Sequence, residues 1–596
     1  MSRFRVVRTG VEWFAKNIKC QDQCPAHTDV PRYLSLIKQG RFTEAYDVNR
    51  QANVLPAILG RVCVRLCEGA CRRRDLDETV SICYLKRSAA DYGRTTTEIA
   101  PVSRKSGPGV AIIGAGPTGL TAASDLARLG YRVDVFEALP VVGGMLRVGI
   151  PAYRLPREAV QETIIEDLRR LGVSIHLNSP AGKDITLDNL LERYDAVLIA
   201  AGAHKPEKLG IPGEYLQGVL HGVTFMRKVN LGERTGLGER VAVVGLGHTA
   251  IDCARSAKRL GARSVHVVYR RTSAEASVSA DEIHEAEEEG ITFGFLLTPL
   301  SVTSIDGFRV SGLACVRNEL GEPDERGRRR PVPLPGSEFE IQVDTVIPAV
   351  SQSPDNSFLP PEIGLAMSRW DRLEVDPKTF MSKRSGVFAA GDFITGPRDV
   401  ISVIADAHSV SASIDKYISG TDRRIRRAKF TVIEKYRREG DFASRERSPM
   451  PTLPAAGRGS LEEEVELGYD PATAMAQADR CLQCQINVMI DGSRCILCGL
   501  CVDGCPMGVL RMVALKDIET TDADRQRLSK GVMKGGAAMV LDEKLCIRCG
   551  LCENRCPTKA ISMVQVAWED VDTGADAADA AEATERGGHK AEARRS

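Results

Sequence analysis

Eight cysteines in the C-terminal part of the chain form two runs with the same spacing. The runs are Cys495-x2-Cys498-x2-Cys501-x3-Cys505 and Cys546-x2-Cys549-x2-Cys552-x3-Cys556, and a proline follows each of them. Thiolates at this spacing hold two four-iron clusters, and the fourth cysteine of each run ligates the cluster of the other run. Zinc is a remote alternative, because eight thiols in this arrangement are typical of iron–sulfur ligation. The spacing therefore predicts electron-transfer chemistry.

Six further cysteines lie in the first 105 residues. They are Cys20, Cys24, Cys63, Cys67, Cys71 and Cys83. The equal spacing of Cys63, Cys67 and Cys71 would place their thiols on one side of a helical turn. Zinc is the alternative here, but zinc sites favour cysteine pairs and histidines, and His27 is the only histidine of this region. Iron–sulfur ligation is favoured, although six thiols are two short of two four-iron clusters.

A glycine-rich turn at Gly114, Gly116 and Gly119 follows a short apolar run, and Pro117 lies within it. A helical pattern at 120–129 comes next, and the apolar run 131–136 ends at Glu137. In a dinucleotide site, the three glycines allow the tight turn, the approach of a pyrophosphate and close helix–strand packing, while the acid binds ribose hydroxyls. This sequence of strand, turn, helix, strand and acid predicts such a site.

The same pattern recurs at 240–271, but its second strand ends in Arg270 and Arg271 instead of an acid. An acid would repel the 2′-phosphate of NADP(H), whereas arginines favour it. The alternative is a solvated basic strand end, and NAD(H) stays possible as the nucleotide. We expect His248 to lie beside the cofactor without acid–base work, and Ala250 to replace the third glycine. The cofactor-binding residues expected here are Gly245, Gly247, His248, Thr249, Ala250, Arg270 and Arg271.

Two more segments belong by position to the first nucleotide site. A glycine-rich loop with Gly144, Met145 and Arg154 follows Glu137, and the strand pattern at 387–390 ends in Gly391 and Asp392. The chain is expected to return to the first domain at this second strand, so that the second nucleotide domain is inserted into the first.

The expected fold class is α/β, with two Rossmann-like dinucleotide-binding domains, a helical iron–sulfur domain before them and a domain after them that resembles bacterial two-cluster ferredoxins. The expected boundaries are 1–105 for the helical domain, 106–228 and 350–420 for the first nucleotide domain, 229–349 for the second, 421–479 for a linker, 480–565 for the ferredoxin-like domain and 566–596 for a disordered tail.

Composition limits the classes of function. The 596 residues include 80 basic and 79 acidic residues, which argues against general nucleic-acid binding. No apolar run is long enough to predict a membrane span, and no signal core is found, so we expect a cytoplasmic protein. Its 18 cysteines are then not expected to form disulfides. Cys253 and Cys315 stand alone and are expected to pack as small apolar residues.

Together these motifs resemble the small subunit of bacterial glutamate synthase. They are similar also to the NADPH-oxidising half of dihydropyrimidine dehydrogenase and to the flavin subunit of NADH-dependent ferredoxin:NADP oxidoreductase. The resemblance covers about residues 15–420 and rests on segment 61–71, the two glycine turns, 269–271 and 390–392. It implies FAD in the first nucleotide domain, NADP(H) in the second and two N-terminal [4Fe-4S] clusters. It also implies that FAD contacts Glu137, Gly144, Arg154 and Asp392.

The chain departs from that family at its N-terminus, where an opening Cys-x2-Cys pair is missing. Cys481 and Cys484 have this form at the other end of the chain, just after an expected helix that starts at Asp470-Pro471. We therefore predict that the C-terminal part folds back. One cluster would use Cys20, Cys71, Cys481 and Cys484, and the other would use Cys24, Cys63, Cys67 and Cys83. Lys86 occupies the position where relatives place a Gln or Glu ligand. The alternative is a separate zinc or free-thiol site at Cys481 and Cys484.

The expected function is hydride exchange between NADP(H) and FAD, with single electrons passed through four [4Fe-4S] clusters to or from a partner subunit or ferredoxin. No catalytic acid or base is predicted. The alternatives are glutamate synthase small subunit proper, a bifurcating NAD(P)H:ferredoxin oxidoreductase subunit, a thioredoxin-reductase-type disulfide reductase, a complete dehydrogenase and a scaffold without nicotinamide binding. The isolated Cys253 and Cys315 argue against the disulfide reductase. No length is left for a substrate barrel, and the intact second turn argues against the scaffold.

Overall fold

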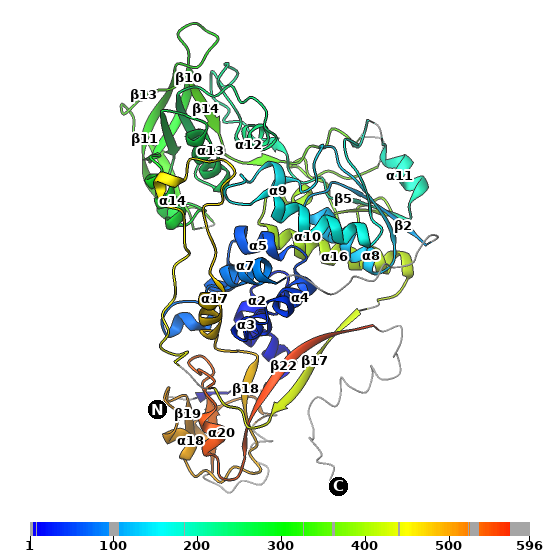
Figure 1. Ribbon diagram of the computed structural model, residues 1–596, viewed down its shortest axis with the longest axis vertical. Coiled ribbons are helices and arrows are strands. Elements are labelled where there is room, and N and C mark those ends of the chain that lie inside the picture. The colour runs from blue at the N-terminus through cyan, green and yellow to red at the C-terminus, as the bar shows by residue number, and fades with distance from the viewer. Residues whose placement is uncertain are drawn as a thin grey trace.

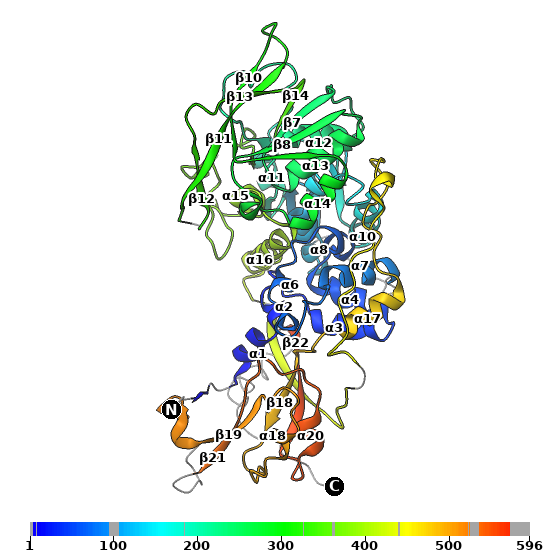
Figure 2. The same cartoon turned by 90° about the vertical axis from the view of Figure 1, so that its left-hand side faces the viewer.

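The computed structural model describes residues 4–6, 9–93, 107–183, 185–325, 327–359, 364–422, 424–438, 441–522, 524 and 536–572. A helical N-terminal domain lies between the two nucleotide domains on one side and the cysteine-rich C-terminal domain on the other (Figure 1, Figure 2). No helix of the described residues is long and apolar enough to cross a membrane.

The N-terminal domain is helical as expected. Asp29 caps α3 by accepting from the Arg32 N–H, and Val30, Leu34 and Ile37 point into the core of the domain. The helices are α1 (Val11–Asn17), α2 (Lys19–Asp22), α3 (Val30–Lys38), α4 (Phe42–Ala52), α5 (Pro56–Val62), α6 (Leu66–Gly69), the 3-10 helix η1 (Arg72–Asp75) and α7 (Ile82–Tyr92).

The prediction of one helical turn through Cys63, Cys67 and Cys71 is wrong. Helix α5 ends at Val62, and Cys63 and Cys71 both have extended backbone. Arg65 adopts a left-handed conformation with φ of 60°, which breaks the helix between the first two cysteines. Only Cys67 lies in a helix, the short α6.

The first nucleotide domain contains a parallel sheet of order β16-β5-β2-β3-β4. Alternate residues of β2 face opposite sides: Val110 and Ile112 pack with α8 and α16, whereas Ala111 and Ile113 pack with α11. Both faces are covered, so strands β2, β5 and β16 are apolar and buried throughout, whereas β3 and the edge strand β4 carry polar residues. The elements are β2 (Gly109–Ile113), α8 (Pro117–Arg128), β3 (Arg132–Phe136), α9 (Met145–Val148), α10 (Arg157–Arg170), β4 (Ser174–His176), α11 (Leu187–Arg193), β5 (Ala196–Ile199), β16 (Val387–Ala389), α15 (Asp392–Thr395) and α16 (Val400–Ser419).

The second nucleotide domain combines a parallel sheet, β14-β7-β8-β9, with an antiparallel sheet that covers one face of it. Its elements are α12 (Gly222–Asn230), β7 (Arg240–Val244), α13 (His248–Arg259), β8 (Ser264–Tyr269), the 3-10 helix η2 (Ser273–Glu275), α14 (Ala280–Glu288), β9 (Thr292–Phe295), β10 (Leu297–Thr303), β11 (Gly312–Pro323), β12 (Arg329–Pro333), β13 (Phe339–Gln342) and β14 (Thr345–Pro348). The short strands β6 (Lys205–Pro206) and β15 (Gln352–Ser353) pair where the chain enters and leaves this domain.

The expected boundary at residue 229 is therefore too late. Phe225 and Met226 of α12 belong to the same apolar core as Val241 and Val243 of β7. Leu216 packs with Val244 and Val346 on the other face of the sheet. The position of α12 is fixed by these long-range contacts, which a local sequence pattern does not reveal.

The C-terminal region differs most from the expectations. The expected linker contains β17 (Arg424–Ile433), which pairs along its whole length with β22 (Ile561–Asp572), while β18 (Ile486–Ile490) pairs with the other edge of β22. The tail boundary at 566 is wrong for this reason, and 573–596 lie outside the described residues. The remaining elements are β1 (Phe4–Arg5), α17 (Pro471–Asp479), α18 (Leu500–Asp503), β19 (Leu510–Ala514), β20 (Ile518–Glu519), β21 (Ala537–Leu541), α20 (Leu551–Arg555) and the 3-10 helices η4 (Ala455–Gly457) and η5 (Leu515–Asp517).

Candidate redox-cofactor sites

A large cavity lies where the two nucleotide domains meet. Its volume is about 1370 Å³, and both glycine turns line it. Each turn follows the carboxyl end of a parallel strand, which is where open α/β sheets bind nucleotides. Of the predicted cofactor-binding residues, those that line the cavity are Gly114, Gly116, Pro117, Glu137, Gly144, Met145 and Asp392 of the first domain and Gly245, Gly247, His248, Thr249, Arg270 and Arg271 of the second.

The glycines of the turns are required by close backbone contacts. Gly114 has φ of +105°, and a Cβ there would lie 2.4 Å from the carbonyl oxygen of Ala200. Gly245 has φ of +125°, and its Cβ would lie 2.4 Å from the carbonyl oxygen of Ala349. Gly119 does not line the cavity; its Cβ would lie 2.0 Å from the Gly114 carbonyl oxygen, so it serves helix–strand packing.

Two carboxyl groups, that of the buried Glu137 and that of the half-buried Asp392, line the first half of the cavity. The Glu137 carboxylate accepts from the Ala115 N–H at 2.7 Å and the Leu139 N–H at 2.8 Å, which holds it at the end of β3. Asp392, at the start of α15, accepts from the Arg398 N–H at 3.0 Å. Burial raises the pKa of Asp392 to about 6. Both carboxyl groups have oxygen atoms that can accept further hydrogen bonds at the cavity.

The two arginines after β8 differ in their surroundings. Arg270 is exposed, whereas Arg271 is buried and donates from Nε to the Arg329 carbonyl oxygen at 2.8 Å. The Arg270 carbonyl oxygen accepts from Asn318 Nδ2 at 3.1 Å, which ties this turn to β11. The two guanidinium groups leave the second half of the cavity basic, as an anionic nucleotide requires.

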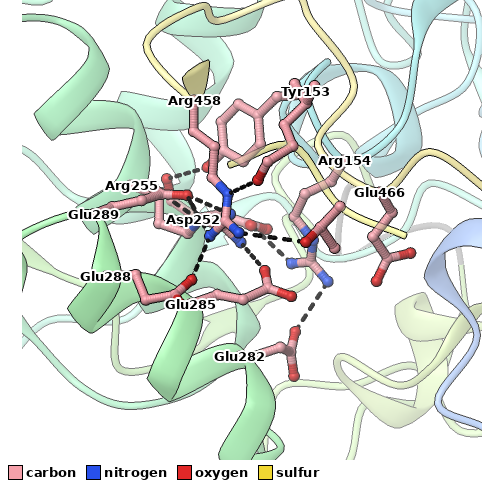
Figure 3. A network of polar contacts seen from close by, with 12 residues as sticks. Tyr153, Arg154, Asp252, Arg255, Glu282, Glu285, Glu288, Glu289, Arg458 and Glu466 are labelled. Carbon is pink, nitrogen blue, oxygen red and sulfur yellow. Dashed lines mark hydrogen bonds and ion pairs between the residues drawn. The ribbon is translucent and has the colours of Figure 1, made fainter. Parts of the chain in front are cut away.

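Three predicted cofactor-binding residues besides Gly119 do not line the cavity: Arg154, Ala250 and Gly391. Gly391 has φ of +70° and lies against Thr118 of α8, and Ala250 is buried in the core of the second domain. The expectation of an FAD contact by Arg154 is not supported, because its guanidinium lies between Asp252 at 2.7 Å and Glu282 at 3.1 Å (Figure 3).

Arg154 belongs to a polar network that joins three parts of the chain (Figure 3). The Arg259 guanidinium lies over the Tyr153 ring, 3.9 Å from the ring centre. The Tyr153 carbonyl oxygen accepts from the Val465 N–H at 2.9 Å. Arg458 donates to Glu288 at 3.0 Å. Residues 441–470, here called the strap, therefore hold both nucleotide domains. Sequence reasoning missed the strap because its polar composition resembles a linker.

Three small cavities are each lined by four cysteines. Among the described residues, no group of His, Cys, Asp or Glu side chains is arranged to hold a single metal ion, and the thiols instead surround a space. The sets are Cys505, Cys546, Cys549 and Cys552; Cys495, Cys498, Cys501 and Cys556; and Cys20, Cys71, Cys481 and Cys484. Each set has the number and type of ligands that a four-iron cluster takes.

The four thiols of the remaining predicted set all lie within electrostatic range of the buried Lys86. Burial lowers the pKa of the Lys86 ammonium, but the thiols of Cys63, Cys67, Cys24 and Cys83 outweigh this effect, so that its pKa is raised. Cys83 Sγ lies 3.3 Å from the Gly60 carbonyl oxygen and 3.4 Å from that of Leu59, at the end of α5. The structure thus gathers these four cysteines around a cation.

The prediction that the C-terminal part folds back onto the N-terminal domain is confirmed. Asp470 caps α17 as expected, accepting from the N–H groups of Ala472 and Thr473, and α17 packs against α3 and α7. Arg480, which is fully buried, donates to the carbonyl oxygens of Thr79 and Glu78 at 2.9 Å each. These bonds deliver Cys481 and Cys484 to Cys20 and Cys71.

Comparison with known proteins agrees with this geometry. Residues 104–409, about half of the chain, match the family described as pyridine nucleotide-disulphide oxidoreductase. The chain belongs to this family. Within the pyridine nucleotide-disulphide oxidoreductases it carries two additions: residues 13–98 match dihydropyrimidine dehydrogenase domain II, 4Fe-4S cluster, and residues 494–560 match the 4Fe-4S dicluster domain.

Several relatives in this family share most of the chain. NADP(+)-dependent formate dehydrogenase subunit beta of Moorella thermoacetica is 42% identical over an alignment of 506 positions that covers 79% of this chain and 71% of the relative. NADPH-Fe(3+) oxidoreductase subunit beta of Geobacter sulfurreducens is 39% identical over 78% of this chain and 75% of its own. Glutamate synthase [NADPH] small chain of Escherichia coli is 34% identical over 67% and 89%. The resemblance to the glutamate synthase small subunit is confirmed.

The residues present fit the cofactors of this pyridine nucleotide-disulphide oxidoreductase. FAD and NADP(H) fit a cavity that contains two glycine turns, one ending at an acid and one at arginines, and [4Fe-4S] clusters fit the cysteine sets. Among the described residues, no cysteine lines the large cavity, and Cys253 Sγ lies 3.6 Å from the Gly222 carbonyl oxygen in the core. The described residues therefore supply no thiol at the cavity for the disulphide chemistry that the family description names.

Proposed function

We propose that the protein is the NADPH-linked electron-transfer subunit of an oxidoreductase complex. The observation that carries this proposal is that both glycine turns line one cavity. The strand after the first turn is followed by Glu137 and the strand after the second by Arg270, so that flavin-side and nicotinamide-side residues face each other. When bound, FAD exchanges hydride with a nicotinamide and single electrons with iron–sulfur clusters. The chain itself binds, orients and tunes these groups, and no catalytic acid or base is required.

In this proposal, Glu137 and Asp392 accept hydrogen bonds from FAD, while Gly116 and Gly144 admit its pyrophosphate. The backbones at Gly116 and Gly144 run close together, since a Cβ on Gly144 would lie 2.9 Å from the Gly116 Cα. Arg270 and Arg271 bind the 2′-phosphate of NADPH. His248 lies at the start of α13, where its Nδ1 is 3.2 Å from Glu282 Oε1, and it positions the turn without transferring protons.

We further propose that the four cysteine sets hold four [4Fe-4S] clusters. The two sets of the ferredoxin-like domain mix the runs as the spacing predicts. The N-terminal set with Cys481 and Cys484 has its support in the cavity that these two cysteines share with Cys20 and Cys71. The second N-terminal set, around Lys86, is supported by its position next to α5, which packs against the first nucleotide domain. In this arrangement the cluster sites form one electron relay from the flavin, through the N-terminal domain, to the ferredoxin-like domain.

The chain needs a partner in this scheme, since it has an electron entrance and an exit, and we assign no site for an organic substrate to the part of the chain that the structure describes. Cys498, the exposed cysteine of the outermost set, marks the exit. Relatives named as beta subunits and small chains support a catalytic partner subunit, and a ferredoxin is the alternative acceptor. The reduced state of so many thiols is consistent with work in the cytoplasm.

The test uses the full chain purified without oxygen. With NADPH alone it is expected to bleach the flavin and to reduce one-electron dyes, and to convert no organic substrate. Purification from its native source under mild conditions should then yield a stoichiometric partner. A flavin that NADPH cannot bleach, or an organic product formed in proportion to NADPH by the isolated chain, would contradict the proposal.

A further inference from the structure

Two of the cysteine-lined cavities lie next to each other, one in the N-terminal domain and one in the ferredoxin-like domain. Leu482 and Cys484, from the first, share one apolar cluster with Ile547 and Cys549, from the second. Electrons passing between the two domains must cross this contact if the proposed function holds, and the following inference rests on that function. Three arginines near this contact are fully buried, Arg73, Arg480 and Arg548. Of these, Arg548 lines the second cavity.

Arg548 is bonded to the ligand segments on both sides. Its Nε donates to the carbonyl oxygen of Ile486, two residues after Cys484, at 3.1 Å. Its Nη1 donates to the carbonyl oxygen of Cys546 at 2.5 Å. Its Nη2 donates to Glu543 Oε2 at 2.7 Å. The side chain thus provides a short chain of covalent and hydrogen bonds from one cysteine set to the other.

A second arginine faces the same carboxylate. Arg72, directly after Cys71, lines the first cavity, and its Nη1 donates to the Glu543 carbonyl oxygen at 2.8 Å and lies 3.8 Å from Glu543 Oε2. Arg72 and Arg548 therefore share the Glu543 carboxylate, and the nearby Arg73 and Arg480 share that of Asp77, so that positive charge is in excess at the contact. The Arg548 side chain stays charged, because a guanidinium is not deprotonated in proteins.

We propose that Arg548, supported by Arg72, raises the reduction potentials of the two clusters that meet at this contact. These are the N-terminal cluster of Cys484 and the ferredoxin-like cluster of Cys546. The transfer moves one electron and no proton, so that one site is oxidised as the other is reduced. A buried positive charge favours the extra electron on either neighbour, and the effect is strong because little water screens it. It also offsets the repulsion between the two sites when both are reduced.

Potentiometric titration of the anaerobic holoprotein, followed by electron paramagnetic resonance, tests this role. Arg548→Met is expected to shift the reduction equilibrium of the two flanking sites about tenfold toward the oxidised form, which is 59 mV for one electron. The potentials of the other two sites should change little. Arg548→Lys keeps the charge and should restore most of the potential. Arg494→Met is the matched control, because Arg494 is 64% exposed beside Cys495 and is screened by water.

Iron content separates a structural effect from an electrostatic one. If Arg548→Met loses iron, Arg72→Met carries the test, since it removes the second charge while Arg548 keeps its bonds. Unchanged potentials in whichever variant retains all its iron would overturn the inference. NADPH-driven bleaching of the flavin is recorded in the same samples: its loss in the wild-type protein contradicts the proposed function, whereas normal bleaching with unchanged potentials contradicts only the role of Arg548.

Discussion

Arg154 of the first nucleotide domain and Asp252 of the second are 2.7 Å apart, Nη1 to Oδ1, and Asp252 is only 5% exposed. Burial raises the pKa of the Asp252 carboxyl, and Arg154 lowers it. The pair lies at the boundary of the large cavity, which Asp252 lines. It therefore fixes the two domains relative to each other at the place where their cofactors meet.

The first prediction follows from this pair. Arg154→Met leaves a buried carboxylate without its partner, which should lower the free energy of unfolding of the nucleotide domains by about 3–5 kcal/mol. Chemical denaturation followed by flavin fluorescence measures the change. The double variant Arg154→Met/Asp252→Asn should recover most of it. Arg169→Met is the control, since Arg169 is 77% exposed and its pair with Glu166 should contribute little. Equal losses in the single and double variants would rule out the pair as the cause.

The second prediction concerns nucleotide preference. Arg270→Ala should weaken NADPH binding by about 1.5–3 kcal/mol, the usual value of a charge-assisted hydrogen bond, and leave NADH binding nearly unchanged. The apparent constants from flavin reduction with each nucleotide give the comparison. Arg263→Ala, in the same domain and 79% exposed, should affect neither nucleotide. Equal effects of Arg270→Ala on both nucleotides would mean that no 2′-phosphate is bound there.

The third prediction concerns the cysteines that join the chain ends. Cys481→Ser/Cys484→Ser should remove one N-terminal cluster, so that iron falls by about a quarter from about 16 atoms per chain, the four-iron stoichiometry for four clusters. The matched variant Cys253→Ser alters a buried cysteine outside all four sets and should leave the iron content unchanged. An unchanged iron content in the double variant would falsify the assignment.

The fourth prediction is a dependence of stability on pH. The pKa of Asp392 is raised from 3.8 to about 6 in the folded protein, chiefly by burial. Between these values the unfolded chain has released the proton that the folded chain still holds, so the free energy of unfolding falls as pH rises through this window and stays lower above pH 6. A shift of about two units corresponds to about 3 kcal/mol. Asp392→Asn should remove this decrease, about half of which falls between pH 5 and pH 8. Denaturation of both proteins at these two pH values measures it, and parallel curves would contradict it.

Much of the site could be predicted because its signals are local. The signal is a spacing within one strand–turn–helix unit for the glycine turns, Glu137 and Arg270. It is a spacing within one loop for each of the two cysteine runs. The return of Cys481 and Cys484 followed from a count of ligands. The partners of Arg154, the pairing of β17 with β22 and the place of α12 could not be predicted, since contacts distant in sequence decide them. The helix break at Arg65 gave no signal, because a non-glycine residue takes the left-handed conformation there.

The cavity formed by Cys20, Cys71, Cys481 and Cys484 draws its walls from both ends of the chain. During synthesis it cannot exist until about four hundred residues after Cys71 have left the ribosome. Until then, Cys20 and Cys71 are separated from Cys481 and Cys484 by the two nucleotide domains, which are synthesised in between. Assembly of this site therefore reports that synthesis has passed Cys484: a polypeptide that stops before Cys481 carries complete nucleotide turns and an incomplete half-site in its first domain.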